Sequence, residues 1–259
     1  MNQFPEHIQL AIKASIAAAK EIQKIYVQDF DIIIKSDESP LTQADLNSSK
    51  VILEILKPTN IRIIGEESTI LSYEERKNWE TCWIVDPLDG TKEFIQKNDE
   101  FAVCIALVEK GIPTIGLITS PVEQKIWLGG KLIGFYEIDF QDELKVTEIQ
   151  QNKNKPKIPI VLVSRNHPSE LTDNYLKDLT QKYGELKFVK KGSALKFIDL
   201  ALGKAHFYPR FAPTMEWDIA AGQAILETVG GEVIDTTSGK PLIYNKESLK
   251  NSYFVAQNF

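Results

Sequence analysis

The segment Asp86-Pro87-Leu88-Asp89-Gly90-Thr91 combines the residue types that bind a hard cation. Residues 81–85, which come just before it, form a short, nearly continuous run of apolar, β-forming side chains, and such a run predicts a buried strand. Pro87 restricts the backbone and Gly90 permits a sharp turn, so the two carboxylates and the Leu88 carbonyl can converge on one point. Mg²⁺ needs such an oxygen cluster. An Asp-Gly turn alone is typical of an ordinary strand end. The full run, with two acids and a threonine directly after an apolar strand, is much more specific for a binding site.

Two further acidic segments lie far apart in the sequence. Glu66 belongs to Gly65-Glu66-Glu67-Ser68, which follows a second strand-like run, and Asp218 belongs to Glu216-Trp217-Asp218, at the start of a helical pattern. Taken alone, the first is typical of a solvated loop and the second of an acid favoured by the helix dipole. Their importance depends on whether the fold brings them to Asp86.

Together these segments, the last continuing through residues 219–222, resemble the three signature segments of the inositol monophosphatase superfamily of metal-dependent, lithium-sensitive phosphatases. The order and spacing fit across nearly the whole chain. The resemblance implies a mixed α/β fold, a layered α/β/α/β/α sandwich, with two or three Mg²⁺ ions in its active site. The metal ligands that it implies are Glu66, Asp86, the Leu88 carbonyl, Asp89 and Asp218, with Asp45 as an acid beside the metals.

The physical chemistry agrees with a metal site, because acids gathered in one cleft repel one another strongly unless cations neutralise them. We expect Asp45, Thr91 and Glu66 to be catalytic. The Thr91 hydroxyl would contact the attacking water and be oriented by Asp45 or Glu66, and backbone N–H groups around Gly90 and Thr91 would hold the phosphate. A covalent phosphoenzyme is not expected, because the sequence has no Cys-x5-Arg loop and its three histidines are scattered.

Four segments, residues 89–94, 163–167, 192–197 and 208–214, look like those of bacterial 3′(2′),5′-bisphosphate nucleotidases of the CysQ type. Ala212 stands where that pattern often has glycine, a small change. The implied substrate is adenosine 3′,5′-bisphosphate, and 3′-phosphoadenylyl sulfate is a further candidate. The alternatives are an inositol or broad sugar-phosphate phosphatase and, more remotely, a catalytically silent nucleotide-binding protein.

Basic and polar side chains in these segments would bind a second anionic group of the substrate. Arginine can grip a phosphate through two hydrogen bonds, although each of these residues taken singly is also typical of a solvated or capping position. His206, in an apolar run, is expected to be structural instead. The predicted substrate-binding residues are Glu66, Leu88, Asp89, Gly90, Thr91, His167, Ser193, Lys196, Arg210 and Asp218.

Composition narrows the class of protein. The 259 residues are 43% hydrophobic and 25% charged, enough for a substantial core, and the net charge of −6 argues against a nucleic-acid binder.

Cys82 and Cys104 lie in apolar runs and are expected to be buried free thiols. No apolar stretch has the length of a signal peptide or a membrane span, so we expect a cytoplasmic protein. Peripheral membrane association and self-association stay open.

The elements that must position these residues alternate between helices and strands. Apolar spacing predicts helices over about 6–29, 42–57, 169–183, 193–202 and 216–229. Strands are expected at 61–64, 81–85, 101–108, 114–118, 125–128, 158–163, 186–190, 206–208, 232–234 and 253–255, with Gly129-Gly130 as a hairpin turn. Residues 1–140 would form an α+β half with most metal ligands, 141–157 a polar connection, and 158–259 an α/β half that binds the nucleotide.

Overall fold

A computed structural model describes residues 1–34, 40–141, 143–150, 157–163 and 169–259. A seven-stranded sheet forms its larger part, in the order β3-β4-β5-β6-β7-β8-β9. β3 and β4 are parallel, and the remaining neighbours are antiparallel. The strands are β3 (Arg62–Gly65), β4 (Thr81–Asp89), β5 (Ala102–Glu109), β6 (Ile112–Ser120), β7 (Lys125–Gly130), β8 (Gly134–Asp139) and β9 (Lys145–Glu148).

A second sheet has five strands in the order β11-β10-β12-β14-β13. β10 pairs in parallel with β11 and β12, whereas β14 pairs antiparallel with β12 and β13. Its strands are β10 (Ile160–Val163), β11 (Lys187–Lys190), β12 (Phe207–Arg210), β13 (Glu232–Asp235) and β14 (Phe254–Gln257), and a separate antiparallel pair is β1 (Ile32–Ile34) with β2 (Pro40–Thr42).

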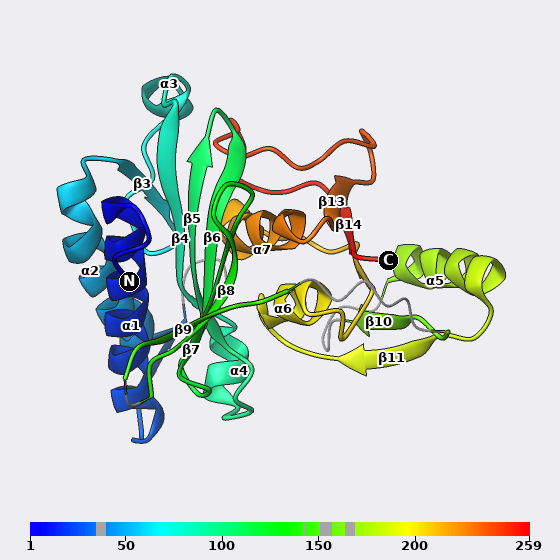
Figure 1. The fold of residues 1–259 in the computed structure, drawn as a ribbon, viewed down its shortest axis with the longest axis horizontal. Helices are drawn as coiled ribbons and strands as arrows, with labels where there is room; N and C mark the ends of the chain where they lie inside the picture. The colour runs from blue at the N-terminus through cyan, green and yellow to red at the C-terminus, as the bar shows by residue number, and fades with distance from the viewer. Residues whose placement is uncertain (35–39, 142, 151–156, 164–168) are drawn as a thin grey trace.

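The helices form three layers around the two sheets (Figure 1). α1 (Glu6–Tyr26) and α2 (Gln43–Leu56) cover the outer face of the large sheet. α6 (Leu195–Ala201) and α7 (Glu216–Thr228) lie between the sheets, and α5 (Glu170–Tyr183) covers the far face of the small sheet. Two shorter α-helices are α3 (Tyr73–Arg76) and α4 (Thr91–Ile95), and a 3-10 helix spans Lys57–Thr59. The predicted α/β/α/β/α sandwich is confirmed.

The alternation of side chains along β4 divides the core between two layers. Trp83 and Val85 pack with α1 and α2, while Cys82 and Ile84 face the cluster that α6 and α7 share with both sheets. A strand buried on both faces reads as continuously apolar, as the sequence indicated. Both cysteines are buried and free, as predicted.

His206 is buried, and its Nδ1 accepts a hydrogen bond from the Ile160 N–H at 3.0 Å. Burial lowers the pKa of its imidazole. Its predicted structural role is therefore confirmed.

The prediction of a hairpin turn at Gly129-Gly130 was wrong, because both glycines belong to β7. A Cβ atom on Gly129 would come within 2.8 Å of the Ile225 Cα, and one on Gly116 within 2.1 Å of the Ala221 carbonyl oxygen. These glycines let α7 pack directly on the backbone of the sheet. The strand β8 was not predicted from the sequence. Residues 141–157 were predicted to be a polar connection, but they contain β9.

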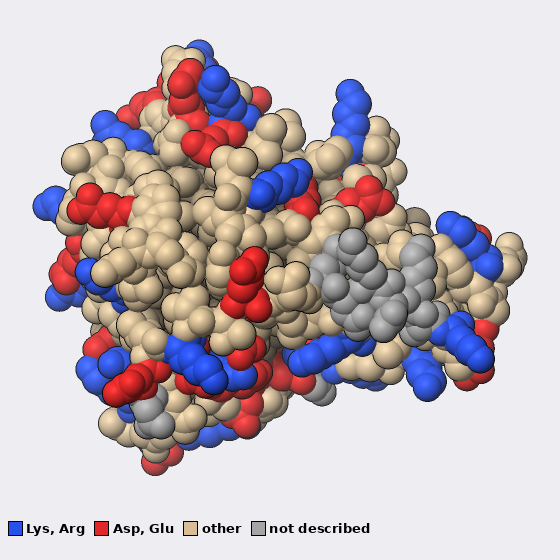
Figure 2. All heavy atoms as spheres, viewed as in Figure 1, with Lys and Arg blue, Asp and Glu red and all other residues tan. Residues whose placement is uncertain are grey.

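Acidic and basic side chains are interspersed on the face of the molecule that Figure 2 draws. Among the described residues on this face, neither sign of charge dominates, whereas a nucleic-acid phosphate backbone is typically bound by a predominantly basic face. Within the part of the chain that the structure describes, no helix has both the length and the apolar character to cross a bilayer.

Candidate active site

The predicted metal-binding segment begins inside a strand and not in a turn. β4 continues through Asp89, with a register shift against β5 between Asp86 and Asp89. Such a bulge redirects side chains at a strand end. The Leu88 N–H donates to Asp86 Oδ1 at 2.9 Å. The chain turns at Gly90, whose φ of 92° favours glycine, and α4 begins at Thr91.

Three aspartates from two distant segments converge at this strand end. One carboxylate oxygen each from Asp86, Asp89 and Asp218 lie within 4.8 Å of one another. Asp86 is buried, whereas the other two are partly exposed and line a pocket. Carboxylates this close bind a shared cation or repel one another.

Neighbouring groups hold the two pocket-lining aspartates in place. Asp218 lies in the first turn of α7, and its Oδ2 accepts the Met215 N–H at 2.8 Å. Asp89 Oδ2 accepts the Ser193 hydroxyl at 2.6 Å and also the Ala194 N–H. Ser193 therefore contacts a predicted metal ligand, which fits a positioning role as well as the predicted contact with substrate.

Burial and mutual repulsion raise the pKa values of these acids. The pKa of Asp86 lies well above its usual range because of burial and then of the charges of Glu66, Asp89 and Asp218. The pKa of Asp218 rises to about 8, mainly through burial and then through Asp89. Glu66 thus belongs to the same electrostatic cluster, and its N–H donates to the Val85 carbonyl at 3.2 Å. Buried carboxylates that resist ionisation together fit a site for divalent cations.

Asp45 and Thr91 lie in direct contact beside this cluster. The Thr91 hydroxyl donates to Asp45 Oδ1 at 3.1 Å and lies 3.3 Å from the Leu88 carbonyl oxygen. Asp45 Oδ2 accepts the Thr42 N–H and hydroxyl, each at 2.7 Å, which caps α2. Burial raises the pKa of Asp45. Of the two acids predicted to orient Thr91, Asp45 makes this hydrogen bond.

A pocket next to Asp89 and Asp218 has a basic wall on residues 191–210. Lys196 is only 6% exposed, and its Nζ donates to the Ser193 carbonyl at 2.7 Å and lies 5.1 Å from the centre of the Tyr208 ring. Arg210, at the end of β12, donates to the Pro213 carbonyl at 3.3 Å. The lining residues are Asp89, Gly90, Lys92, Glu93, Lys191, Gly192, Ser193, Ala194, Lys196, Phe197, Tyr208, Arg210, Thr214, Asp218 and Ile219.

The structure adds residues that the site prediction did not include. Lys191 pairs with Asp199 at 2.7 Å while lining the pocket, and burial raises the pKa of the half-buried Glu93 carboxyl. Lys92 and Glu93 directly follow Thr91, a position that could have identified them. His167, the remaining predicted contact, lies outside the described residues.

Comparisons with known proteins agree with this geometry. The sequence profile described as the inositol monophosphatase family matches residues 5–258. Proteins named "3′(2′),5′-bisphosphate nucleotidase CysQ" from Salmonella typhimurium and Escherichia coli K12 are 39% and 38% identical to this chain, each match covering 92% of this chain and 94% of the relative.

Solved structures show the same relationship. The crystal structure of CysQ from Bacteroides thetaiotaomicron, described as a bacterial member of the inositol monophosphatase family, aligns with a TM-score of 0.85 and 39% identity over 96% of each chain. An inositol monophosphatase from Anabaena aligns with a TM-score of 0.72 and 25% identity, over 96% of this chain and 89% of that one. The chain belongs to the inositol monophosphatase family.

Proposed function

We propose that this protein is a Mg²⁺-dependent phosphatase that hydrolyses adenosine 3′,5′-bisphosphate to AMP and inorganic phosphate, and that 3′-phosphoadenylyl sulfate is a second substrate. The observation that carries the proposal is the pocket, in which Asp89 and Asp218 face a wall with Lys196 and Arg210. The acids suit cations that bind the reacting phosphate, and the basic wall suits a second anionic group. The names of the relatives at 38–39% identity support the same substrate.

The acidic cluster would hold two or three Mg²⁺ ions. Glu66, Asp86, the Leu88 carbonyl, Asp89 and Asp218 would supply the oxygen ligands, with Asp45 beside them. When bound, the ions offset the charge of the phosphate oxygens and increase the acidity of water. The Ser193 hydroxyl fixes the carboxylate of Asp89, so part of the site is oriented by protein contacts alone.

Thr91 and Asp45 would prepare the attacking water. The Thr91 hydroxyl donates its hydrogen bond to Asp45 Oδ1, so the lone pairs of its oxygen can accept a hydrogen bond from the water. The water oxygen forms a bond to phosphorus and releases one proton, the bond from phosphorus to the 3′-oxygen breaks, and the 3′-oxygen takes up one proton, so that water is added across the P–O bond. Backbone N–H groups around Gly90 and Thr91 would bind the phosphate oxygens.

The two halves of the chain would contribute different functions to this site. Residues 1–140 carry Asp45, Glu66, Asp86 and Asp89, while residues 158–259 carry Asp218 and the Lys196–Arg210 wall. In this proposal the first half supplies most of the metal ligands and the second selects the nucleotide, and neither half is active alone.

A substrate panel tests the proposal. Values of kcat/KM for adenosine 3′,5′-bisphosphate and for inositol 1-phosphate are measured with Mg²⁺ and with excess EDTA. We expect strong preference for the nucleotide and no turnover in EDTA. A strong preference for the inositol ester would instead support a general monophosphatase. Nucleotide binding without phosphate release under any condition would indicate a catalytically silent protein.

A further inference from the structure

Glu216 is a carboxylate whose burial the proposed reaction does not explain. It is 0% exposed, lies in the first turn of α7 two residues before Asp218, and does not line the pocket. A buried carboxylate is costly unless charges and hydrogen bonds compensate it. Its Oε2 accepts the Asn245 N–H at 2.7 Å, and its Oε1 accepts the Lys246 N–H at 3.1 Å and the Lys246 ammonium at 2.5 Å.

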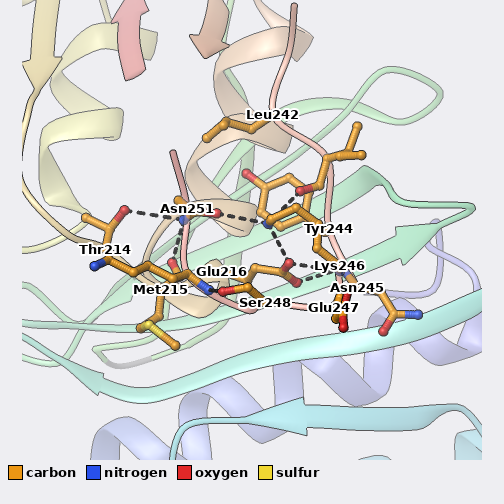
Figure 3. Close-up of polar contacts among 12 residues, drawn as sticks. Thr214, Met215, Glu216, Leu242, Tyr244, Asn245, Lys246, Glu247, Ser248 and Asn251 are labelled. Carbon is orange, nitrogen blue, oxygen red and sulfur yellow. Dashed lines mark hydrogen bonds and ion pairs between the residues drawn. The ribbon is translucent and has the colours of Figure 1, made fainter. Parts of the chain in front are cut away.

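Lys246 connects Glu216 to a segment near the end of the chain. Besides Glu216, its ammonium donates to the Ile243 carbonyl at 2.9 Å and to Asn251 Oδ1 at 3.3 Å. Three acceptors match the three N–H bonds of an ammonium group. Figure 3 shows Lys246 at the centre of these contacts, between Glu216 and Asn251.

Asn251 extends the same network to the residues just before α7. Its side-chain amide donates to the Met215 carbonyl at 2.7 Å and to the Thr214 hydroxyl at 3.3 Å, and its backbone N–H donates to the Thr214 carbonyl at 2.9 Å (Figure 3). Residues 214–216 are therefore held from one side by residues 245–251. The Met215 N–H donates in turn to Asp218 Oδ2, so the network ends on a predicted metal ligand.

An independent anchor holds the supporting segment itself. Arg76, which is buried, donates to Asn245 Oδ1 at 2.8 Å, to the Lys246 carbonyl at 2.5 Å and to the Glu247 carbonyl at 2.8 Å. The backbone of this segment thus does not depend on the Lys246 ammonium. Removing that ammonium should loosen residues 214–218 while leaving the segment in place.

We infer that Lys246, through its ion pair with Glu216, is a positioning residue that sets the orientation of Asp218 for metal binding. This inference rests on the proposed function only in taking Asp218 as a metal ligand. Partners that orient a ligand typically contribute about 10- to 100-fold to metal affinity, although they never touch the metal.

The test compares Lys246→Met, which keeps the stem and removes the charge, with Lys250→Met as a matched control on an exposed lysine of the same segment. The Mg²⁺ dissociation constant is measured by titration calorimetry, and the melting temperature is measured in EDTA. We expect a Mg²⁺ dissociation constant raised about tenfold or more in Lys246→Met, with wild-type affinity in Lys250→Met. Lys246→Arg, which restores the charge, should recover much of the lost affinity.

Unchanged Mg²⁺ affinity in Lys246→Met would overturn the inference, whether or not the melting temperature in EDTA falls. If that melting temperature falls so far that the variant is unfolded, Glu216→Gln, which removes the carboxylate charge from the same ion pair, supplies the comparison, and wild-type Mg²⁺ affinity in Glu216→Gln would also overturn the inference. The proposed function fails separately, if the wild-type protein binds Mg²⁺ but releases no phosphate from the nucleotide.

Discussion

The hydroxyl of Thr91 donates to Asp45 Oδ1 at 3.1 Å, joining the start of α4 to the first turn of α2. Asp45 also accepts two hydrogen bonds from Thr42 and so caps α2. One carboxylate therefore serves both the fold and the proposed chemistry. A change at Thr91 disturbs only the second function and is the cleaner experiment.

Thr91→Val keeps the shape of the side chain but removes its hydroxyl. We expect kcat to fall by about 10²- to 10⁴-fold, the range for a lost proton-transfer contact, with little change in the melting temperature. Thr91→Ser restores the hydroxyl and should recover most of the activity. Comparable kcat values for the valine and wild-type proteins would exclude Thr91 from water activation.

Asp86→Asn should abolish Mg²⁺-dependent phosphate release while the protein still folds. Asparagine Oδ1 can still accept the Leu88 N–H, but the charge that attracts a cation is lost. We expect activity to fall by more than about 100-fold, the upper effect of groups that only support metal ligands. Asp178→Asn, at an exposed position of α5, is the control. Undiminished turnover in Asp86→Asn would contradict the metal site.

The stability of the metal-free protein should depend on pH through Asp218. Its pKa rises from 3.8 to about 8 on folding, so the folded state binds this proton more tightly than the unfolded state. The contribution to the free energy of unfolding is fully present below the unfolded pKa of 3.8 and is lost as the pH rises through about 8. We expect the melting temperature in EDTA to be lower at about pH 8.5 than at about pH 5.5.

Asp218→Asn is the control for this pH effect, because it removes the titrating group. The melting temperature of the variant minus that of the wild type should increase as the pH rises, because only the wild type loses this stabilisation. Mg²⁺ should also stabilise the wild type more at the alkaline pH, where the bare carboxylates repel most. A difference that stays constant across the pH range would show that Asp218 ionises normally.

The three acids that the structure brings together, Asp86, Asp89 and Asp218, could be identified from the sequence because each lies in a short segment of distinctive residue types. The local conformation of these segments could not be predicted from the sequence. Asp86 was expected in a turn, yet β4 continues past it because pairing with β5, through Cys104, extends the strand. Such pairing joins residues that are distant in the sequence, whereas the proline and glycine within the segment favour a turn.

Long-range contacts also explain the other gaps between sequence and structure. Gly129-Gly130 has the composition of a turn, and only the approach of Ile225 reveals why a strand needs a residue without a side chain there. The contact between Glu216 and Lys246 joins positions that no motif connects. Chemistry leaves a local signature in sequence, whereas close packing and buried ion pairs depend on the assembled fold.

Gly129→Ala tests the packing of α7 on the large sheet. The added Cβ would lie 2.8 Å from the Ile225 Cα, a backbone atom that can move only if α7 shifts. We expect the free energy of unfolding to fall by about 1–3 kcal/mol, the usual cost of overpacking. Leu132→Ala, in the exposed turn after β7, should be nearly neutral. Equal denaturation midpoints for the two variants would indicate that the interface has room to adjust.

Lys196→Ala tests which part of the pocket recognises the nucleotide. Lys196 Nζ donates to the Ser193 and Lys191 carbonyls, so its loss disturbs the loop that holds Asp89 as well as any contact with substrate. The effect on Asp89 applies equally to every phosphate ester, whereas the lost charge matters only for a substrate with a second anionic group. The ratio of kcat/KM between adenosine 3′,5′-bisphosphate and a small monoester therefore isolates recognition.

We expect this ratio to fall by about 10- to 100-fold in Lys196→Ala, as for the loss of one charge-assisted hydrogen bond worth about 1.5–3 kcal/mol. Ser193→Ala is the comparison, because it also releases Asp89, whose carboxylate accepts the Ser193 hydroxyl, but leaves the lysine charge in place. If Ser193 only positions Asp89, kcat falls for both substrates and the ratio stays within about twofold of the wild type, since a loss common to both esters cancels in the ratio. A lower ratio in Ser193→Ala would assign the serine to the nucleotide contact as well. Parallel losses in Lys196→Ala would instead assign the lysine to the support of Asp89.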